Sequence, residues 1–110
     1  MAKQIVFTYD DTEYTLEFTR RTVRQMEEEG FIAQDIDKKP MTLLPQLFAG
    51  AFKAHHRFVK QSVIDEIYDA MPSKEKLIGK LAEMYNEPIT TLMDEPDKKS
   101  TKNVNWEANW

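Results

Sequence analysis

The two histidines, His55 and His56, have the most versatile side-chain chemistry in the sequence, because imidazole binds metals and transfers protons near neutral pH. Neighbouring residues on a helix point about 100° apart, so this adjacent pair cannot act as the i, i+4 histidine pair of a helical zinc site. The sequence has no cysteine and no other histidine, so carboxylates would have to supply most ligands to a metal. We therefore expect neither a metal nor another cofactor.

The sequence also lacks the short motifs that carry much of enzymatic chemistry. Gly30, Gly50 and Gly79 are isolated from one another, so no glycine-rich loop is present to bind phosphate. There is no GxSxG nucleophile motif and no HExxH zinc motif. The carboxylates lie mostly on faces that we expect to be polar and solvated. These features predict that the protein is not an enzyme.

Length and composition restrict the fold and the partners. The 110 residues suit one domain, and the net charge of −4 argues against nucleic-acid binding, which requires a basic face. No apolar run approaches the roughly 18 residues of a membrane span, and the beginning, MAKQIVFTYD, lacks the apolar region of a secretory signal. Together with the absence of cysteine, these features predict a cytoplasmic protein with no nucleic-acid or membrane partner.

The longest helical pattern of apolar residues is TLLPQLFAGAFKAHHRFV, residues 42–59. Its apolar side chains recur at about i, i+4 and i+8, which predicts one wide apolar stripe along a helix. Thr42 is expected as the N-cap and Pro45 in the first turn. The stripe consists of Leu43, Leu44, Leu47, Phe48, Ala51, Phe52, Phe58 and Val59. So many large apolar groups on one helix can serve a partner as well as a core.

Residues 3–18 show the period-two alternation of a β-hairpin. A turn centred on Asp11 and Thr12 would place Tyr9 opposite Tyr14. All the large apolar residues of the two strands would then lie on one side, which must pack on something because a lone hairpin is marginal in water. A longer loop remains open, because Thr12 suits a tight turn poorly.

Three further helices are predicted from their caps and stops. Thr19 is expected to cap residues 20–29, which Gly30 ends. Ser62 is expected to cap a helix through Met71, ended by Pro72. The next helix is expected to follow a Ser73 cap and to stop at Asn86-Glu87-Pro88, with a last short turn at Ile89, Leu92 and Met93.

The composition changes from residue 94 onward. DEPDKKSTKNVN has one apolar residue in twelve, too few to offset the entropy of ordering. We therefore expect an α+β fold, with an N-terminal β-hairpin packed on about four α-helices as one domain over residues 1–93. A mobile polar tail over residues 94–110 is expected to end in the pair Trp106 and Trp110.

Three groups of residues are candidate partner contacts, and none is catalytic. The acidic cluster Glu27, Glu28 and Glu29 lies at the negative end of its expected helix, where an opposite charge on a partner would stabilise it. A solvated surface helix explains the same charges. Trp106 and Trp110 either fold onto the domain or anchor it to a partner, because tryptophan is enriched at hot spots. The third group is the apolar stripe, with Leu43, Leu44, Leu47, Phe48, Phe52 and Phe58.

The order of these segments resembles a known family. IVFTYDDTEYTLEFT is followed by TVRQMEEEGF, LLPQLFAGAFKAHH, VIDEIYDAM, LIGKLAEMYNE and NVNW. The chain is similar over residues 3–93 and the tryptophan-bearing end to the small tail assembly chaperones of long-tailed phages and prophages, in particular a family found in intestinal Firmicutes prophages. These motifs are patterns of apolar spacing and contain no catalytic signature.

The resemblance implies a non-enzymatic chaperone that binds the tape measure protein during tail morphogenesis, with tail tube protein as a further candidate partner. It also implies a protein of the cytoplasm of the bacterial host that is absent from the mature virion. A homo-oligomer is expected for a separate reason, because an apolar client-binding face tends to bind another copy when no client is present. The alternatives are a structural subunit of the phage tail or head–tail connector and, less favoured by the charge, a small DNA-binding regulator. The last would use Arg20, Arg21 and Arg24.

Overall fold

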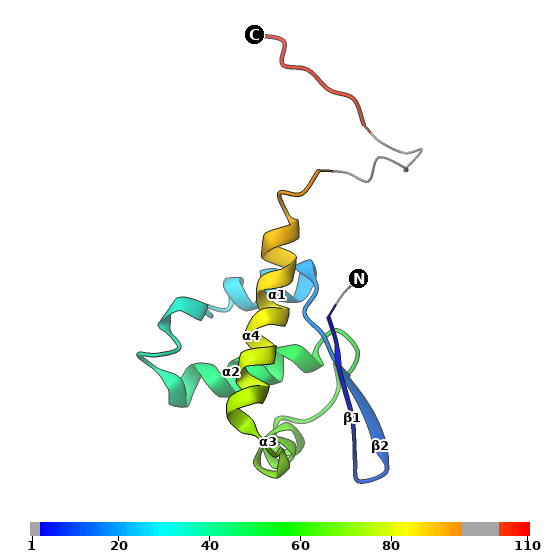
Figure 1. Ribbon diagram of the computed structural model, residues 1–110, viewed down its shortest axis with the longest axis vertical. Coiled ribbons are helices and arrows are strands. Elements are labelled where there is room, and N and C mark those ends of the chain that lie inside the picture. The colour runs from blue at the N-terminus through cyan, green and yellow to red at the C-terminus, as the bar shows by residue number, and fades with distance from the viewer. Residues whose placement is uncertain (1–2, 96–103) are drawn as a thin grey trace.

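The computed structural model describes residues 3–95 and 104–110. It confirms the predicted α+β fold, an N-terminal hairpin followed by four helices (Figure 1). The elements are β1 (Ile5–Tyr9), β2 (Thr12–Leu16), α1 (Arg20–Glu28), a 3-10 turn (Ala33–Asp35), α2 (Pro40–Phe52), α3 (Gln61–Ala70) and α4 (Lys74–Thr91). Within the described residues, none of these helices combines the length and hydropathy that a transmembrane segment requires.

The hairpin turn differs from the expected one. Tyr9 pairs with Thr12, and Phe7 pairs with Tyr14, so the loop is Asp10-Asp11 and the predicted pairing of Tyr9 with Tyr14 is wrong. Both loop residues have positive φ, 50° and 62°, as a two-residue type I′ turn requires. A short Asp tolerates this conformation better than the β-branched Thr12 would. The shift is two residues, so the apolar residues still share the face that packs on the helices.

The N-terminus of α1 is confirmed. The Thr22 N–H donates to Thr19 Oγ1 at 3.2 Å, and the Thr19 N–H donates to Thr22 Oγ1 at 2.8 Å. This reciprocal arrangement is a capping box in which a threonine replaces the usual acid. The helix ends before Gly30, whose φ of 94° is accessible to glycine at little cost.

Both ends of α2 lie earlier in the sequence than predicted. The helix begins at Pro40, which suits a first position because its missing N–H would have no helical partner. Thr42 is therefore an exposed residue inside the first turn and not the cap, and Pro45 lies inside the helix. The helix ends at Phe52 and not at Val59, because the Ala51 carbonyl accepts the Glu17 N–H of the hairpin side at 3.0 Å.

The last two helices also differ at their ends. Lys60, and not Ser62, precedes α3, and the Gln61 side chain donates to Asp65 at 2.9 Å across the first turn. Ser73 precedes α4 as predicted, but its side chain makes no capping hydrogen bond. The predicted stop at Pro88 is wrong, since α4 continues to Thr91. Contact with α1 stabilises this end, where the Arg20 guanidinium donates to the Thr91 carbonyl at 3.0 Å.

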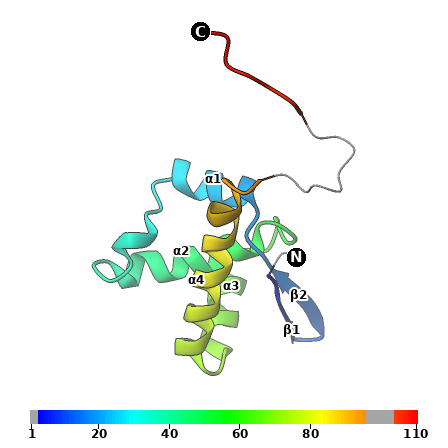
Figure 2. The same ribbon diagram turned by 45° about the horizontal axis from the view of Figure 1, so that its top comes forward.

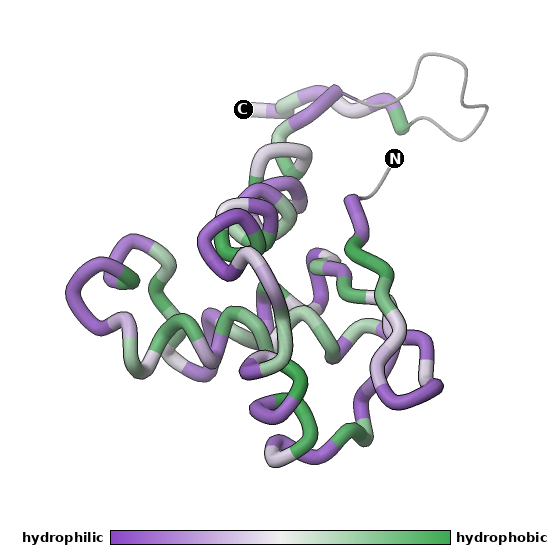
Figure 3. Tube along the Cα trace, turned by 60° about the horizontal axis from the view of Figure 1, so that its bottom comes forward, coloured by the Kyte–Doolittle hydropathy of each residue, from purple (hydrophilic) through white to green (hydrophobic). Residues whose placement is uncertain are grey.

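The core lies between the hairpin and the helices and is rich in aromatic rings. Phe52 contacts Tyr14 of β2 with ring centroids 5.8 Å apart and Phe48 at 5.2 Å, both edge to face. A second group joins Tyr85 of α4 to Phe18 and Phe31 at 5.4 and 5.3 Å. Hydrophobic and hydrophilic residues alternate along the helical trace, so each helix turns an apolar face to this core (Figure 3).

The predicted tail follows the last helix of the domain, α4. The prediction for residues 94–110 falls in part on residues 96–103, which lie outside the described residues. Residues 104–110 have neither helix nor strand, and they lie away from the helices in two views of the molecule (Figures 1 and 2).

Candidate partner-binding site

The structure divides the predicted apolar stripe into core and surface. Four of its six candidate partner contacts are buried, with at most 6% of their surface exposed, and pack in the core. These are Leu43, Leu47, Phe48 and Phe52. Their side chains stabilise the fold, so their prediction as exposed partner contacts is corrected, although Phe48 also lies at the bottom of a surface groove. Leu44 is partly buried, and Phe58 is 94% exposed in the α2–α3 connection because the helix ends six residues earlier.

A groove of about 280 Å³ lies between the first part of α2 and the second half of α3, and we call it the α2–α3 groove. Phe48 and Tyr68 contact each other inside it, with ring centroids 5.2 Å apart. Met41 at its edge is 89% exposed. The groove is lined by Pro40, Met41, Leu44, Pro45, Phe48, Asp65, Tyr68 and Asp69. Its apolar floor and two acidic rim residues suit an apolar side chain from a segment that also carries basic residues.

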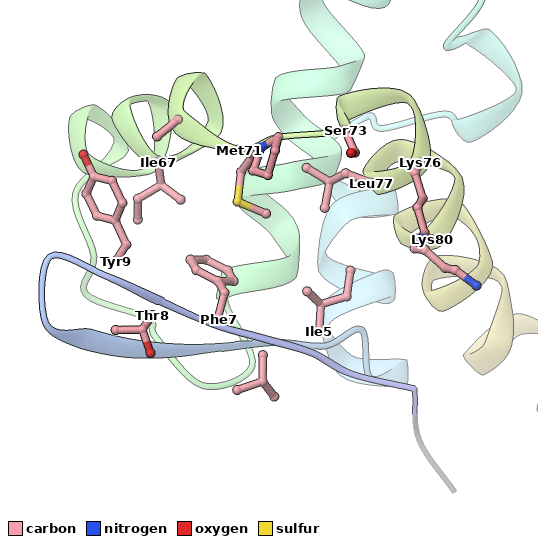
Figure 4. Close-up of a pocket in the computed structure, with 13 residues that line it drawn as sticks. Ile5, Phe7, Thr8, Tyr9, Ile67, Met71, Ser73, Lys76, Leu77 and Lys80 are labelled. Carbon is pink, nitrogen blue, oxygen red and sulfur yellow. The ribbon is translucent and has the colours of Figure 1, made fainter.

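A larger groove of about 440 Å³ runs beside β1, and we call it the β1 groove. Figure 4 shows Ile5, Phe7 and Tyr9 pointing from β1 into this space, opposite the α3–α4 corner. That corner contributes Ile67, Ala70, Met71, Pro72, Ser73, Lys76, Leu77 and Lys80. The space is therefore apolar between its walls, with two lysines on the α4 side.

The sequence did not reveal the β1 groove, because its walls come from segments about 65 residues apart that only the tertiary fold brings together. The one available signal was the apolar face of the hairpin, which had to pack on some other element. The structure shows that β1 is only partly covered, since Ile5, Phe7 and Tyr9 all remain partly exposed.

The three glutamates do not act as one cluster. The Glu29 carboxylate forms an ion pair with Lys53 at 3.3 Å, whereas Glu28 is exposed. Glu27 lines a small depression with Ile89 and Leu92 at the end of α4. Burial raises the pKa of Tyr85, and the negative charge of Glu27 raises it further.

Trp106 and Trp110 remain on the surface. Trp106 is 82% exposed and Trp110 is fully exposed. The structure therefore does not place the two indoles on the domain. The two residues are four apart in the sequence, but the segment between them is not helical. Their apolar rings are free to contact another molecule.

The side chains of the two histidines contact the hairpin and the residue that follows it. His56 Nε2 accepts the Thr15 N–H at 2.9 Å, and His55 Nε2 lies 2.7 Å from Glu17 Oε1. Burial of the His56 ring, followed by the nearby His55, lowers the pKa of His56. No group of three His, Asp or Glu side chains in the described part of the chain could hold a metal ion. Both imidazoles therefore join the connection after α2 to β2 and to the residue that follows β2.

Comparisons with known proteins identify a family and no closer relative. Neither a curated protein nor a solved structure matches the chain. One family model, described as "Domain of unknown function (DUF5055)", matches residues 1–110. The match extends over the hairpin, the four helices and the tryptophan segment. The chain therefore belongs to the DUF5055 family.

Proposed function

We propose that this chain is a non-enzymatic tail assembly chaperone of a phage or prophage, which binds tape measure protein in the cytoplasm of the bacterial host. The observation that carries the proposal is the α2–α3 groove, an apolar depression beside the 89% exposed side chain of Met41. A small domain that leaves such a surface in water is suited to covering apolar surface on another protein. The resemblance of the ordered sequence segments to small tail assembly chaperones supplies the identity of the client.

A long amphipathic helix is the client structure that fits this groove best. Such a helix presents apolar side chains at i, i+3, i+4 and i+7, and one of them can enter between α2 and α3. Phe48 and Tyr68 provide the aromatic floor, and Leu44 lies on the α2 wall. Asp65 and Asp69 on the rim favour client helices that carry Lys or Arg beside the apolar residues.

Each groove has room for only a small contact, so the affinity of one copy for one client segment is expected to be low. Many copies along one client compensate through avidity, because each bound copy holds the client near the next. Self-association of the chaperone would strengthen this effect. Tail tube protein is a second proposed partner, recruited once the client is covered.

Co-expression with tape measure protein tests the proposal. The wild-type chain is expected to keep the client soluble, whereas Met41→Asp with Leu44→Asp is expected to weaken binding by about tenfold or more by charging the groove. Thr42→Asp is the matched control, because Thr42 is exposed on the same helix and does not line the groove. Circular dichroism checks that all variants fold.

Two results would contradict the proposal. The first is a client whose solubility does not change when the wild-type chain is present. The second is the presence of the chain in purified virions by mass spectrometry, which would favour the alternative of a tail or connector subunit. A salt-dependent gel shift with DNA would instead favour a DNA-binding regulator.

A further inference from the structure

The two outer edges of the hairpin differ in their hydrogen bonding. The Asp10-Asp11 loop makes Tyr9 and Thr12 a hydrogen-bonded pair, and hydrogen-bonded and non-hydrogen-bonded pairs then alternate along the strands. Val6 and Thr8 on β1 therefore turn their backbone N–H and C=O groups away from β2. The corresponding groups of β2 belong to Glu13 and Thr15, and to Glu17 just beyond the strand.

The β2 edge is occupied over its second half. The Thr15 N–H donates to His56 Nε2 at 2.9 Å, and the Glu17 N–H donates to the Ala51 carbonyl at 3.0 Å. Within residues 3–95 and 104–110, no element other than β2 forms a backbone hydrogen bond with β1. β1 thus presents an edge with free donors and acceptors, and such an edge is a template for another strand.

The β1 groove extends along this same open edge. A strand added beside β1 would lie over the space between β1 and the α3–α4 corner (Figure 4). One of its faces would cover Ala70, Met71 and Pro72 and continue the apolar side of the hairpin. The required occupant is an extended segment with alternating apolar residues, one face of which packs against the apolar walls of the groove.

Residues 104–110 of this chain have those properties. The sequence VNWEANW alternates strictly, with apolar residues at 104, 106, 108 and 110 and polar residues between them. In a strand, the two indoles would lie on the same face, four residues apart. The only charged side chain of the segment is Glu107, which alternation places on the opposite face of the strand from the two indoles and therefore towards solvent.

We propose that residues 104–110 of one copy bind the β1 groove of a second copy as an added β-strand, and that the two copies exchange these segments. The segment lies away from its own domain, with both indoles exposed, so it is available to another molecule (Figure 2). Reciprocal exchange gives a two-fold dimer in which both grooves are filled. This inference is independent of the α2–α3 groove, which remains open to a client.

Burial of the indoles is the main stabilising contribution to this interface. A buried aromatic side chain removes about 150–250 Å² from water, so the four indoles of a dimer would remove roughly 600–1,000 Å².

Tryptophan fluorescence is a specific test, because the chain has two tryptophans and both lie in the exchanged segment. For the full-length wild-type chain, we expect analytical ultracentrifugation to show a dimer whose formation shifts the indole emission to shorter wavelength. Val6→Pro removes an outward N–H that no β2 residue accepts, and Val6→Thr is the matched control that keeps it. We expect Val6→Pro to raise the dimer Kd by at least about tenfold.

A second variant keeps the test valid if Val6→Pro does not fold. Trp106→Ala with Trp110→Ala changes exposed residues only and is expected to be a folded monomer at concentrations where the wild type is dimeric. The decisive experiment mixes the two variants. The tryptophan double variant supplies an intact β1 groove, and Val6→Pro supplies an intact segment 104–110. The mixture should therefore form a heterodimer through a single exchanged strand.

Each of the following results would contradict the proposed exchange of segments between two copies. A monomer with blue-shifted emission at every concentration would place the segment on its own domain. A monomer with solvent-exposed indoles at every concentration would leave the groove empty. A dimer that persists without the two tryptophans, or whose emission does not shift, would use another surface.

Discussion

At the scale of single residues, His56 is the side chain that joins the end of α2 to the hairpin. Its Nε2 atom must be unprotonated to accept the Thr15 N–H at 2.9 Å. Burial of the ring and the adjacent His55 lower the pKa of His56 below its ordinary value of 6.5. The folded protein therefore binds this proton less readily than the unfolded chain does.

The sign of the resulting pH dependence follows from proton linkage. Below about pH 6.5 the unfolded chain binds more protons at His56, so stability falls as the pH falls towards the folded-state pKa. We predict that His56→Gln, which keeps a hydrogen-bond acceptor but does not titrate, flattens the loss of stability between about pH 7.5 and pH 5.5. Urea denaturation at several pH values measures this change.

His55→Gln is the matched control, because His55 pairs with Glu17 and not with the backbone of β2. Titration of the Glu17 carboxyl group affects stability at a lower pH than titration of His56. Burial raises its pKa, but hydrogen bonds with Gln4 and His55 and the charge of His55 lower it more, to below its ordinary 4.5. The stability that Glu17 contributes above its ordinary pKa is lost only as the pH falls through the lower, folded-state value. An unchanged slope in His56→Gln would contradict the assignment.

At the scale of elements, helix ends were the least predictable feature, and the reasons are specific. Thr19 was recognised as a cap because its signal is local, a hydroxyl before a helical run that ends at glycine. Thr42 has the same local signal but follows Pro40, which had already begun the helix. The end of α2 depended on a contact between Ala51 and the hairpin that no local pattern encodes.

The two threonines provide a direct test of this distinction. We predict that Thr19→Ala lowers the free energy of unfolding by about 0.5–2 kcal/mol, because the Thr22 N–H loses its acceptor. Thr42→Ala should change it by less than about 0.5 kcal/mol, since Thr42 is exposed and caps nothing. Equal effects in thermal or urea denaturation would refute the observed start of α2.

At the scale of the whole molecule, the fold class was predictable because hydrophobic periodicity is strong in both the hairpin and the helices. The candidate site was less predictable. The stripe showed which residues are apolar, but only the packed structure shows that Phe52 faces the hairpin and Phe58 faces solvent. Grooves between distant segments, such as the one beside β1, leave no sequence pattern of their own.

These two phenylalanines belong to the same stripe in the sequence and should respond differently to truncation. We predict that Phe52→Ala lowers the free energy of unfolding by about 3–5 kcal/mol, because the ring is 1% exposed and packs between three other aromatic side chains. Phe58→Ala should cost less than about 0.5 kcal/mol, since its ring is 94% exposed. Differential scanning calorimetry distinguishes the two, and a large effect at Phe58 would place that ring in the core.

The occupied edge of β2 has a consequence for the behaviour of the protein at high concentration. Amyloid-like growth requires strands that accept a neighbour on both sides, so that stacking repeats without limit. Here the end of α2 and the His56 ring cover one of the two sides. Pairing through the open β1 edges would therefore leave the partly covered β2 edges outermost, so that it joins two hairpins and does not build an endless ladder.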